Sequence, residues 1–294
     1  MEIGDLRQDV EVSLDGVNFE SMKGWIKEAY SRGGINTIAW HMNHPVTDGD
    51  TWDRTPGVAA ILPGAEQHEK FKTWLDKFAA FTQDLKGAGG ELIPILFRPY
   101  HEHTGSWFWW GDEQTTIEDY VALWRFTVEY LRDEKGVHNL LYVYSPDNQA
   151  GREFANYLTK YPGDDYVDVL GMDDYGSVDG RDATEFSNEL AWLVEEAEKR
   201  NKIAALSETG VENIPNPNWW TEQLAPSFKK NPKARGIAYV LTWRNANKER
   251  EQRDHFYASH PGHSSAPDMK AFSELELFVF EDDLPDLYSL PDKK

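Results

Sequence analysis

Short apolar runs alternate with longer amphipathic stretches along the chain, and this alternation most constrains the fold. The short runs are rich in Val, Ile and Leu and lack strict polar alternation, which is typical of parallel strands buried on both faces. The longer stretches carry apolar residues at helical spacing. Strand followed by helix, repeated, predicts an α/β fold with a parallel sheet. The predicted strands are residues 35–41, 92–98, 140–145, 167–172, 203–207 and 237–243, and the predicted helices are residues 19–31, 66–85, 116–131, 183–200 and 217–229.

Two architectures share this rhythm, an open doubly wound sheet and a (β/α)8 TIM-type barrel. A doubly wound sheet usually carries a Gly-rich phosphate-binding turn after an early strand, and the sequence has no such turn. In a barrel, polar residues at the carboxyl ends of the strands are the functional ones. Such residues follow most of the predicted strands. We therefore expect a (β/α)8 TIM-type barrel that forms one domain over residues 1–294, with a surface tail at about 281–294.

The charge of the chain excludes several classes of partner. With 51 Asp and Glu against 30 Lys and Arg, the formal net charge is −21, which repels the phosphates of nucleic acids and anionic membrane surfaces. No run of 18 uncharged apolar residues is present, so we expect no membrane insertion. No signal peptide is visible in residues 1–5. The absence of Cys excludes disulfides and thiolate chemistry.

The 12 Trp residues are the unusual feature of the composition. Large rings can fill a large core. They can also line an open cleft, where flat sugar rings stack on indole faces next to carboxylates. Trp124 has helical spacing with Leu123 and Phe126 and is expected in the core. Trp219 is expected in packing or surface contact, whereas Trp52 lies in a loop where a distal sugar site is one alternative.

Two glutamates meet the demands of glycosidic bond cleavage. That reaction needs one carboxyl group that protonates the leaving oxygen and a second carboxylate that attacks the anomeric carbon or directs water to it. Glu102 and Glu208 each stand at a predicted strand end. The alternative for each is a structural role, either capping the next helix or pairing with Arg98 or Arg244. Two such glutamates among aromatic residues favour the chemical role.

Histidine pairs raise the alternative of a metal site. His41 with His44, and His101 with His103, are possible ligand pairs, and alternation along a strand would put His101 and His103 on one side with Glu102 opposite. However, the sequence has no His-x-x-x-His pair on a predicted helix and no Cys. We therefore expect no metal and no cofactor.

One segment identifies a family. Residues 98–111, RPYHEHTGSWFWWG, resemble the acid/base signature of glycoside hydrolase family 26, the β-mannanases. Residues 33–41, 171–175, 206–210 and 241–245 also look like this family's strand ends, in its order, so the resemblance covers essentially the whole chain. It implies retaining hydrolysis of β-1,4-mannosidic bonds in β-mannan or manno-oligosaccharides by a secreted, periplasmic or cell-surface enzyme. We also expect a monomer.

The resemblance implies roles for individual residues. Glu102 would be the acid/base and Glu208 the nucleophile, through a glycosyl-enzyme intermediate, and their environments must differ to keep one pKa raised and the other low. Arg98 would sit beneath Glu208 and keep it ionised. Tyr175 would hydrogen-bond the nucleophile, and Trp243 would form the floor of the −1 sugar site. The residues expected to bind substrate or order the carboxylates are His41, Arg98, His101, Trp107, Asp173, Tyr175, Trp243 and Arg244.

Two alternative functions stay open at this point. The family also contains enzymes that cut β-1,3-xylan or mixed-linkage β-glucan, and the aromatic run at residues 107–110 together with His101 favours the mannan activity. A non-catalytic carbohydrate-binding barrel is the other alternative. It would be expected to lack one of the two glutamates, and the sequence has both.

Counting strands predicts an incomplete barrel. In the barrel superfamily to which the family belongs, the acid/base follows the fourth strand and the nucleophile the seventh, so residues 35–41 become the third strand. Only 34 residues precede it, and a predicted helix occupies residues 19–31 of these. We therefore expect the chain to begin near the end of the second strand, at residues 2–5, and to lack the first. The open edges would then be covered by another segment or chain, or leave a less stable sheet.

Overall fold

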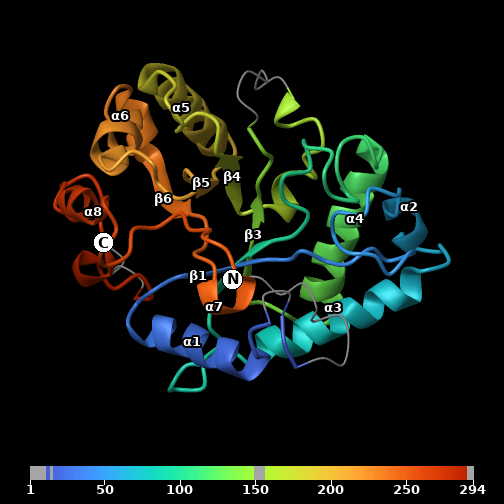
Figure 1. The fold of residues 1–294 in the computed structure, drawn as a ribbon. Coiled ribbons are helices and arrows are strands. Elements are labelled where there is room, and N and C mark those ends of the chain that lie inside the picture. The colour runs from blue at the N-terminus through green and yellow to red at the C-terminus, as the bar shows by residue number, and fades with distance from the viewer. Residues whose placement is uncertain (1–10, 14–15, 149–155, 290–294) are drawn as a thin grey trace, which may run out of the picture. The chain divides into compact units, whose positions relative to one another are not determined.

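The computed structural model describes residues 11–13, 16–148 and 156–289 (Figure 1). The chain divides into two compact units. The first consists of Met1–Tyr144, Phe154–Asp168 and Leu284–Lys294, and the second of Ser145–Glu153 and Val169–Asp283. The single domain expected over residues 1–294 stays a prediction.

Within its described residues, the first unit contains three short parallel strands in sequence order. They are β1 (Asn36–Ala39), β2 (Ile95–Arg98) and β3 (Leu140–Tyr144). Ile38 pairs with Phe97, and Ile95 pairs with Leu140, in the parallel register. All side chains of β2 are buried, as expected for a parallel strand covered on both faces. The three strand predictions for this unit are confirmed.

The helices of the first unit begin where the sequence provides capping side chains. Asn18 Oδ1 accepts hydrogen bonds from the first amides of one helix, and Thr116 Oγ1 accepts one from the Asp119 amide of another. The predicted helices end within about two residues of the observed ones. The helices are α1 (Phe19–Ser31), α2 (Val58–Ile61), α3 (His68–Gln83) and α4 (Ile117–Glu129), with a π-helical turn at Tyr130–Glu134 and a 3-10 turn at Asp164–Tyr166.

Aromatic rings fill the core of the first unit. The ring centroid of Phe78 on α3 lies 5.2 Å from that of Trp40 and 4.3 Å from that of Phe97 on β2. Trp124 is fully buried, which confirms its predicted place in the core. Many of the Trp side chains thus serve packing, each burying a large apolar area.

In the second unit, the described strands are also parallel and follow sequence order. They are β4 (Val169–Asp174), β5 (Ile203–Thr209) and β6 (Ile237–Thr242), and they confirm the remaining strand predictions. Gly171 allows β4 and β5 to approach closely, because a Cβ there would lie 2.5 Å from Ser207 Oγ. Every side chain of β4 is buried, whereas those of β6 are half-buried or exposed.

The helical segments of the second unit differ from the predicted ones in one place. The predicted helix at 217–229 is present as a shorter segment, in which a π-helical turn continues directly into a three-residue α-helix. Pro226, which has no amide hydrogen to continue the helical ladder, lies in the first turn of that short helix. The segments are α5 (Ala183–Lys199), the π-helical turn Trp220–Leu224, α6 (Ala225–Ser227), the 3-10 turn Pro232–Gly236, α7 (Lys248–Glu251), α8 (Ala266–Ser273) and the 3-10 turn Glu281–Asp283.

Six parallel strands in the described residues confirm a parallel α/β fold, and a closed barrel stays a prediction. Before β1, the β pairing in the described part of the chain is limited to an isolated bridge between Val12 and Asn18. The predicted remnant of a strand at 2–5 lies outside the described residues. Near the carboxyl end, the Tyr288 hydroxyl donates a hydrogen bond to Gly34 O over 2.9 Å, so this part of the surface tail contacts the first unit.

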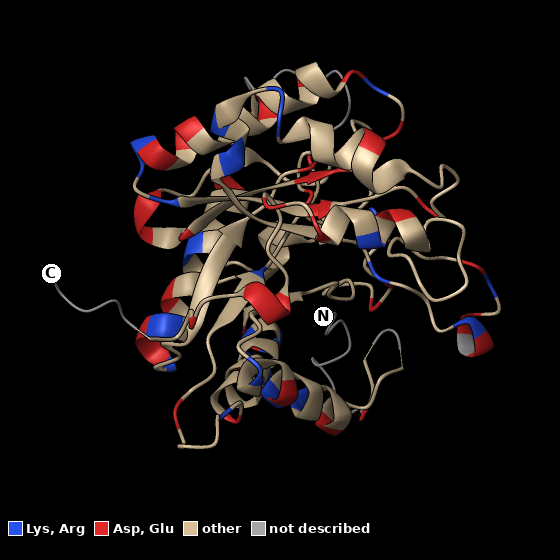
Figure 2. Cartoon of the chain, turned by 90° about the vertical axis from the view of Figure 1, so that its left-hand side faces the viewer, with Lys and Arg blue, Asp and Glu red and all other residues tan. Residues whose placement is uncertain are grey.

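Charged residues of both signs are interspersed along the helices (Figure 2). On α5, Arg200 just past its end pairs with Glu196 one turn earlier, with 2.7 Å between nitrogen and oxygen. No helix among the residues that the structure describes is long and apolar enough to cross a membrane.

Candidate active site

The segment after β2 turns sharply away from the strand. Tyr100 and Glu102 have φ angles of 50° and 53°, in the left-handed region that residues with a Cβ rarely adopt. Hydrogen bonds to three successive carbonyl groups hold this turn. They run from Tyr120 Oη to Tyr100 O (2.9 Å), from Trp110 Nε1 to His101 O (2.8 Å) and from Gly105 N to Glu102 O (2.9 Å). Because such strain persists only where the surroundings fix it, the turn gives the Glu102 side chain a defined direction.

Trp107 holds the carboxylate of Glu102. Its indole Nε1 donates a hydrogen bond to Glu102 Oε2 over 2.8 Å. The indole ring lies so close to Gly105 that a Cβ there would come within 2.2 Å of a ring carbon. Glycine therefore allows the approach, and Trp107 is placed by the same loop that carries Glu102.

An aromatic cluster of His41, Trp52, His101 and Phe108 lies in the first unit. His41 stacks on Trp52 with ring centroids 5.8 Å apart and meets His101 edge to face at 4.6 Å. Phe108 lies 5.2 Å from His41. Burial lowers the pKa of His101 well below its usual value, and the nearby His41 and Arg98 lower it further, so His101 is neutral at pH 7.

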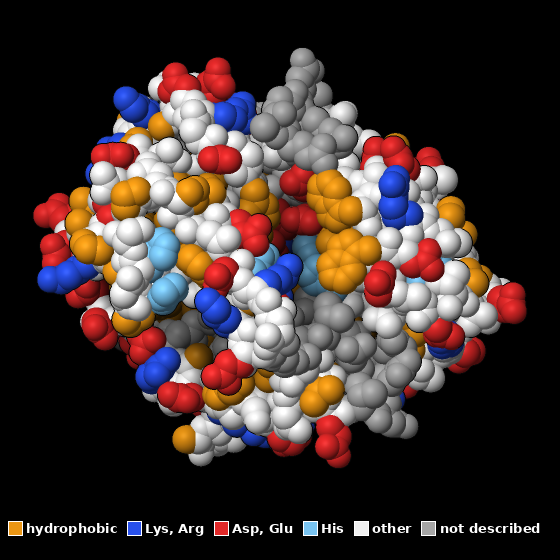
Figure 3. Space-filling model, in the orientation of Figure 1, with side chains coloured by type: hydrophobic (Ala, Val, Ile, Leu, Met, Phe, Trp, Pro, Cys, Tyr) orange, Lys and Arg blue, Asp and Glu red, His pale blue; other side chains and the backbone are white. Residues whose placement is uncertain are grey.

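Trp52 is the exposed member of this cluster, with half of its side chain open to solvent. An indole whose other side is backed by an imidazole offers a flat apolar face to a ligand. On the face drawn in Figure 3, hydrophobic side chains lie next to histidine and acidic ones. This combination is suited to sugars, which have apolar ring faces and polar edges.

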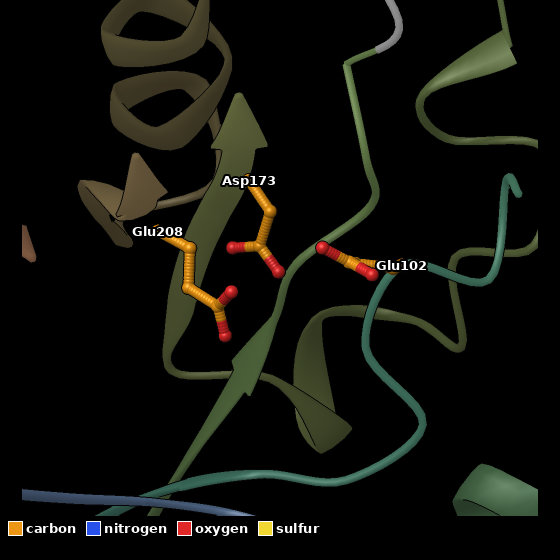
Figure 4. A group of neighbouring side chains, drawn as sticks. All are labelled: Glu102, Asp173 and Glu208. Atoms are coloured by element: carbon orange, nitrogen blue, oxygen red, sulfur yellow. The ribbon is translucent and has the colours of Figure 1, made fainter. Parts of the chain in front are cut away.

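In the second unit, two carboxylates lie at the ends of neighbouring strands. Asp173 of β4 and Glu208 of β5 are register partners, and Figure 4 shows their side chains next to each other. The Tyr175 hydroxyl donates to Glu208 Oε2 over 2.6 Å, and Ser207 Oγ donates to Asp173 Oδ1 over 2.7 Å. Both carboxylates are buried. Each thus has a hydroxyl donor that fixes its orientation. Glu102, drawn in the same figure, belongs to the first unit.

A β-bulge explains how two successive residues of β5 approach one residue of β4. Met172 pairs with Leu206 and Asp173 pairs with Glu208, so Ser207 is an extra residue on β5. A bulge of this kind re-aims side chains and is common next to active sites. It turns Glu208 towards Tyr175 while Ser207 reaches Asp173.

A second carboxyl pair adjoins Asp173. Asn148 Nδ2 donates to Asp174 Oδ2 over 2.6 Å and to Glu189 Oε2 over 2.9 Å, and Ser177 Oγ donates to Asp174 Oδ2 over 2.7 Å. Burial raises the pKa of Asp174, and burial together with the charge of Asp174 raises the pKa of Glu189. One amide and one hydroxyl therefore connect the two carboxyl groups, and the charge of Asp174 opposes the ionisation of Glu189.

Trp243 and Arg244 directly follow β6. The Trp243 amide donates to Thr209 O over 3.0 Å, which places this residue beside the end of β5. Arg244 donates to both carboxylate oxygens of Glu251, over 2.8 and 3.0 Å. These hydrogen bonds lower the pKa of Glu251 to about 2. The guanidinium thus forms a bidentate ion pair with α7, and its contact with substrate stays a prediction.

The predicted site residues form one group in each unit. In the first unit, Trp107 binds Glu102, and His41 contacts His101. Arg98 is buried at the end of β2, and its predicted place beneath the nucleophile stays a prediction. In the second unit, the predicted hydrogen bond between tyrosine and nucleophile candidate is present. Each unit thus contains one glutamate whose carboxylate is oriented by a hydrogen-bond donor. Glycosidic cleavage needs two carboxyl groups.

Sequence reasoning missed several members of these groups. Phe108 packs against His41, and Ser207 binds Asp173. Tyr257 meets Tyr175 edge to face with ring centroids 5.6 Å apart. The position of Ser207 directly before a strand-end glutamate was an available signal. Tyr257 lies in a loop 82 residues after Tyr175, and no local pattern indicates that contact.

Two of the four histidines considered as metal ligands, His44 and His103, have other partners. His44 Nε2 contacts Thr55 O at 2.7 Å, and its Nδ1 accepts from the amides of Val46 and Thr47. Both nitrogens of His103 lie 3.0 Å from tyrosine hydroxyls. Ring nitrogens engaged in this way are not directed at a shared metal position.

Comparisons with known proteins agree on one family. A family model described as Glycosyl hydrolase family 26 matches residues 8–256. A mannan endo-1,4-β-mannosidase of Bifidobacterium adolescentis is 36% identical over 273 residues, 87% of this chain and 27% of that protein. Endoglucanase H of Acetivibrio thermocellus is 35% identical over 167 residues, 54% of this chain and 16% of that protein.

A solved structure shares the fold over the whole chain. The structure of a GH26 β-mannanase from Bacteroides ovatus matches with a TM-score of 0.92 and 41% identity, covering 100% of this chain and 83% of that chain. In contrast, the chain spans only 27%, 31% and 47% of the length of three curated mannan endo-1,4-β-mannosidases that it matches.

Proposed function

We propose that this chain, which belongs to glycosyl hydrolase family 26, hydrolyses β-1,4-mannosidic bonds in mannan-type polysaccharides with retention of configuration. Its substrate is β-mannan or a manno-oligosaccharide. It acts as one catalytic domain and as a monomer, outside the cytoplasm where such polymers occur. The proposed reaction needs no metal and no cofactor.

The pair of oriented glutamates carries this proposal. Glu208 accepts a 2.6 Å hydrogen bond from Tyr175, and Glu102 accepts a 2.8 Å hydrogen bond from Trp107. The two carboxylates therefore have different donors, an acidic phenol for one and a neutral indole for the other. Different environments are what a nucleophile and an acid/base need. Retention further requires that the two carboxyl groups approach to about 5–5.5 Å in the working enzyme.

The reaction takes two steps. In the first, Glu208 attacks the anomeric carbon while Glu102 gives its proton to the leaving glycosidic oxygen, so the C–O bond breaks and a glycosyl-enzyme ester forms. In the second, Glu102 accepts a proton from water, and the water oxygen displaces Glu208 from the sugar. Each carboxyl group ends in its starting state.

The remaining residues bind the sugar. Trp243 forms the floor of the −1 site, and Asp173 and His41 contact hydroxyl groups next to the point of cleavage. His101 is neutral, so one ring nitrogen can donate and the other accept. Its Nδ1 has no hydrogen-bond partner in the described residues although it is buried, which leaves it available to a substrate hydroxyl. Arg98 and Arg244 supply positive charge near the carboxylates.

Kinetics of two variants test the roles. Glu208→Ala should abolish turnover of every substrate. Glu102→Ala should lower kcat/KM on manno-oligosaccharides by a factor of about 10²–10⁴. On a dinitrophenyl β-mannobioside, whose leaving group needs no proton, this variant should retain the wild-type kcat/KM. Azide should raise turnover of the second variant. The reverse pattern would mean that the two roles are exchanged.

Two further measurements test the reaction class. Proton NMR should show the β-anomer as the first product from linear mannan, and an α-anomer would contradict retention. Activity should survive dialysis against EDTA, and complete loss that returns with a divalent cation would contradict the metal-free reaction.

The match to Endoglucanase H supports a second candidate, hydrolysis of a β-glucan. Mannose and glucose differ at C2, so contacts to the 2-hydroxyl in the −1 site separate the two activities. Initial rates on linear mannan, galactomannan and mixed-linkage β-glucan should favour the mannans. A preference for the glucan would overturn the proposed specificity while leaving the two glutamate roles in place.

A further inference from the structure

His103, the residue after Glu102, lies at the centre of a buried polar network. Tyr120 Oη lies 3.0 Å from His103 Nδ1, and Tyr144 Oη lies 3.0 Å from its Nε2. All three side chains are almost completely buried. Tyr120 belongs to α4 and Tyr144 ends β3, so the imidazole joins two elements of the first unit.

One hydroxyl group contacts the chain on both sides of Glu102. Tyr120 Oη lies 2.9 Å from Tyr100 O, two residues before Glu102, and 3.0 Å from His103 Nδ1, one residue after it. Tyr100 and Glu102 are the two residues of this turn with positive φ. A strained turn persists only where surrounding contacts hold it in place, and Tyr120 supplies one such contact on each side of Glu102.

Counting protons defines the state of the imidazole. Burial lowers the pKa of His103 well below its usual value, and Lys160 lowers it further, so the ring is neutral with a single N–H. Tyr144 has its shortest contact, 2.7 Å, with Tyr157 O and donates its proton there. The Tyr120 hydroxyl donates its proton to Tyr100 O. The single N–H of the imidazole therefore donates to one of the two hydroxyl oxygens.

A buried lysine fixes Tyr120 from the other side. The Lys160 ammonium lies 5.7 Å from the centroid of the Tyr120 ring, donates to Thr115 O over 3.2 Å and pairs with Asp112 Oδ1 over 3.2 Å. The Asp112 amide in turn donates to Gly105 O over 2.8 Å. These contacts connect the start of α4 with both ends of the loop that carries Trp107.

We propose that His103, Tyr120 and Tyr144 are positioning residues that hold the left-handed turn at Glu102 and thereby aim its carboxyl group at the glycosidic oxygen. The proposal rests on the proposed function, because it takes Glu102 as the acid/base. These residues act through the backbone of the turn and not through contact with substrate.

Tyr120→Phe tests the network with the least disturbance. It keeps the ring and its contact with Lys160 and removes only the hydroxyl that reaches Tyr100 and His103. Tyr130→Phe is the matched control, since Tyr130 is a buried tyrosine just after α4 whose hydroxyl donates to Asp76 over 2.7 Å.

The expected readout separates proton transfer from general damage. Because a well-placed general acid contributes about 10²–10⁴-fold, we expect Tyr120→Phe to lower kcat/KM on manno-oligosaccharides about tenfold, while Tyr130→Phe changes it less than about twofold. On the dinitrophenyl β-mannobioside, both variants should retain the wild-type kcat/KM. Tyr144→Phe should repeat the pattern of Tyr120→Phe and replaces it if that variant does not fold.

Three outcomes would overturn the proposal. The first is an equal loss of kcat/KM on both substrates, and the second is a loss of kcat/KM no larger than in Tyr130→Phe. Either result would mean that the network serves only to pack the core. Hydrogen exchange provides a readout that needs no activity: the Gly105 amide, which donates to Glu102 O, should exchange faster in Tyr120→Phe than in Tyr130→Phe. Equal exchange rates would also overturn it. A wild-type protein that cleaves neither substrate would instead overturn the proposed function.

Discussion

Removing one hydroxyl group from the nucleophile candidate should slow one step of the reaction more than the other. The Tyr175 hydroxyl lies 2.6 Å from Glu208 Oε2, and Glu208 is 3% exposed. In the first step the carboxylate loses its negative charge to the new ester bond, so the hydrogen bond weakens. In the second step the charge returns as Glu208 departs, so the phenol stabilises the transition state. Tyr175→Phe should therefore slow breakdown of the glycosyl-enzyme more than its formation.

The size of the effect follows from the strength of the hydrogen bond. Hydrogen bonds to charged groups contribute about 1.5–3 kcal/mol. Complete loss of that contribution in the transition state would slow the step by about ten- to 150-fold, at about 1.36 kcal/mol per factor of ten. Since only part of the charge has returned at the transition state, we expect the lower end for Tyr175→Phe, about a tenfold fall in kcat.

Pre-steady-state kinetics on the dinitrophenyl β-mannobioside measures the two steps separately. If the glycosyl-enzyme forms fast and breaks down slowly, Tyr175→Phe should release a burst of dinitrophenol equal to the enzyme concentration. Its KM should fall together with kcat. Thermal unfolding should show that the variant is folded. A variant with unchanged KM, no burst and equal loss in both steps would refute the reasoning about charge at Glu208.

Two further predictions concern stability and aromatic side chains. Because the pKa of Glu189 is raised, the wild type loses stability as pH rises from about 4.5 through the folded-state pKa, so Glu189→Gln should have the higher Tm at pH 7, with the difference vanishing towards pH 4. A constant difference across this range, measured by calorimetry, would contradict the assigned shift. Trp219 is buried and its indole donates to Val178 O over 2.9 Å, so Trp219→Ala should lower stability by about 3–5 kcal/mol with little change in kcat/KM. Trp243→Ala should instead lower kcat/KM strongly with little change in stability. If both variants lower kcat/KM equally, Trp243 does not belong to the sugar site.

The strands could be predicted because their apolar runs are short and continuous. Residues 237–243 are an example: the observed β6 ends one residue earlier, at Thr242, and the prediction needed no knowledge of partners. The ends of these runs also indicated the site, since parallel strands present their carboxyl ends at one edge. The pairing of Tyr175 with Glu208 came from the resemblance to glycoside hydrolase family 26, and the structure has the two oxygen atoms 2.6 Å apart.

Features that depend on two segments at once could not be predicted in this way. The bulge at Ser207 arises from the register between β4 and β5, and neither strand alone contains that information. The ion pair of Arg244 with Glu251 was missed for a related reason. A guanidinium at a strand end fits substrate binding and local pairing equally well, and the conformation of the following loop decides between them.

His103 shows the same limit most clearly. In the sequence His101 lies two residues away, which on an extended strand would put both side chains on one side and suggested a pair of metal ligands. The left-handed residues Tyr100 and Glu102 interrupt the strand alternation on which that interpretation depended. The hydroxyl groups that face the imidazole come instead from positions 17 and 41 residues further along the chain. A strand-end pattern therefore locates the proposed acid/base, whereas the contacts that hold its turn come from helices and strands whose own patterns only indicate burial.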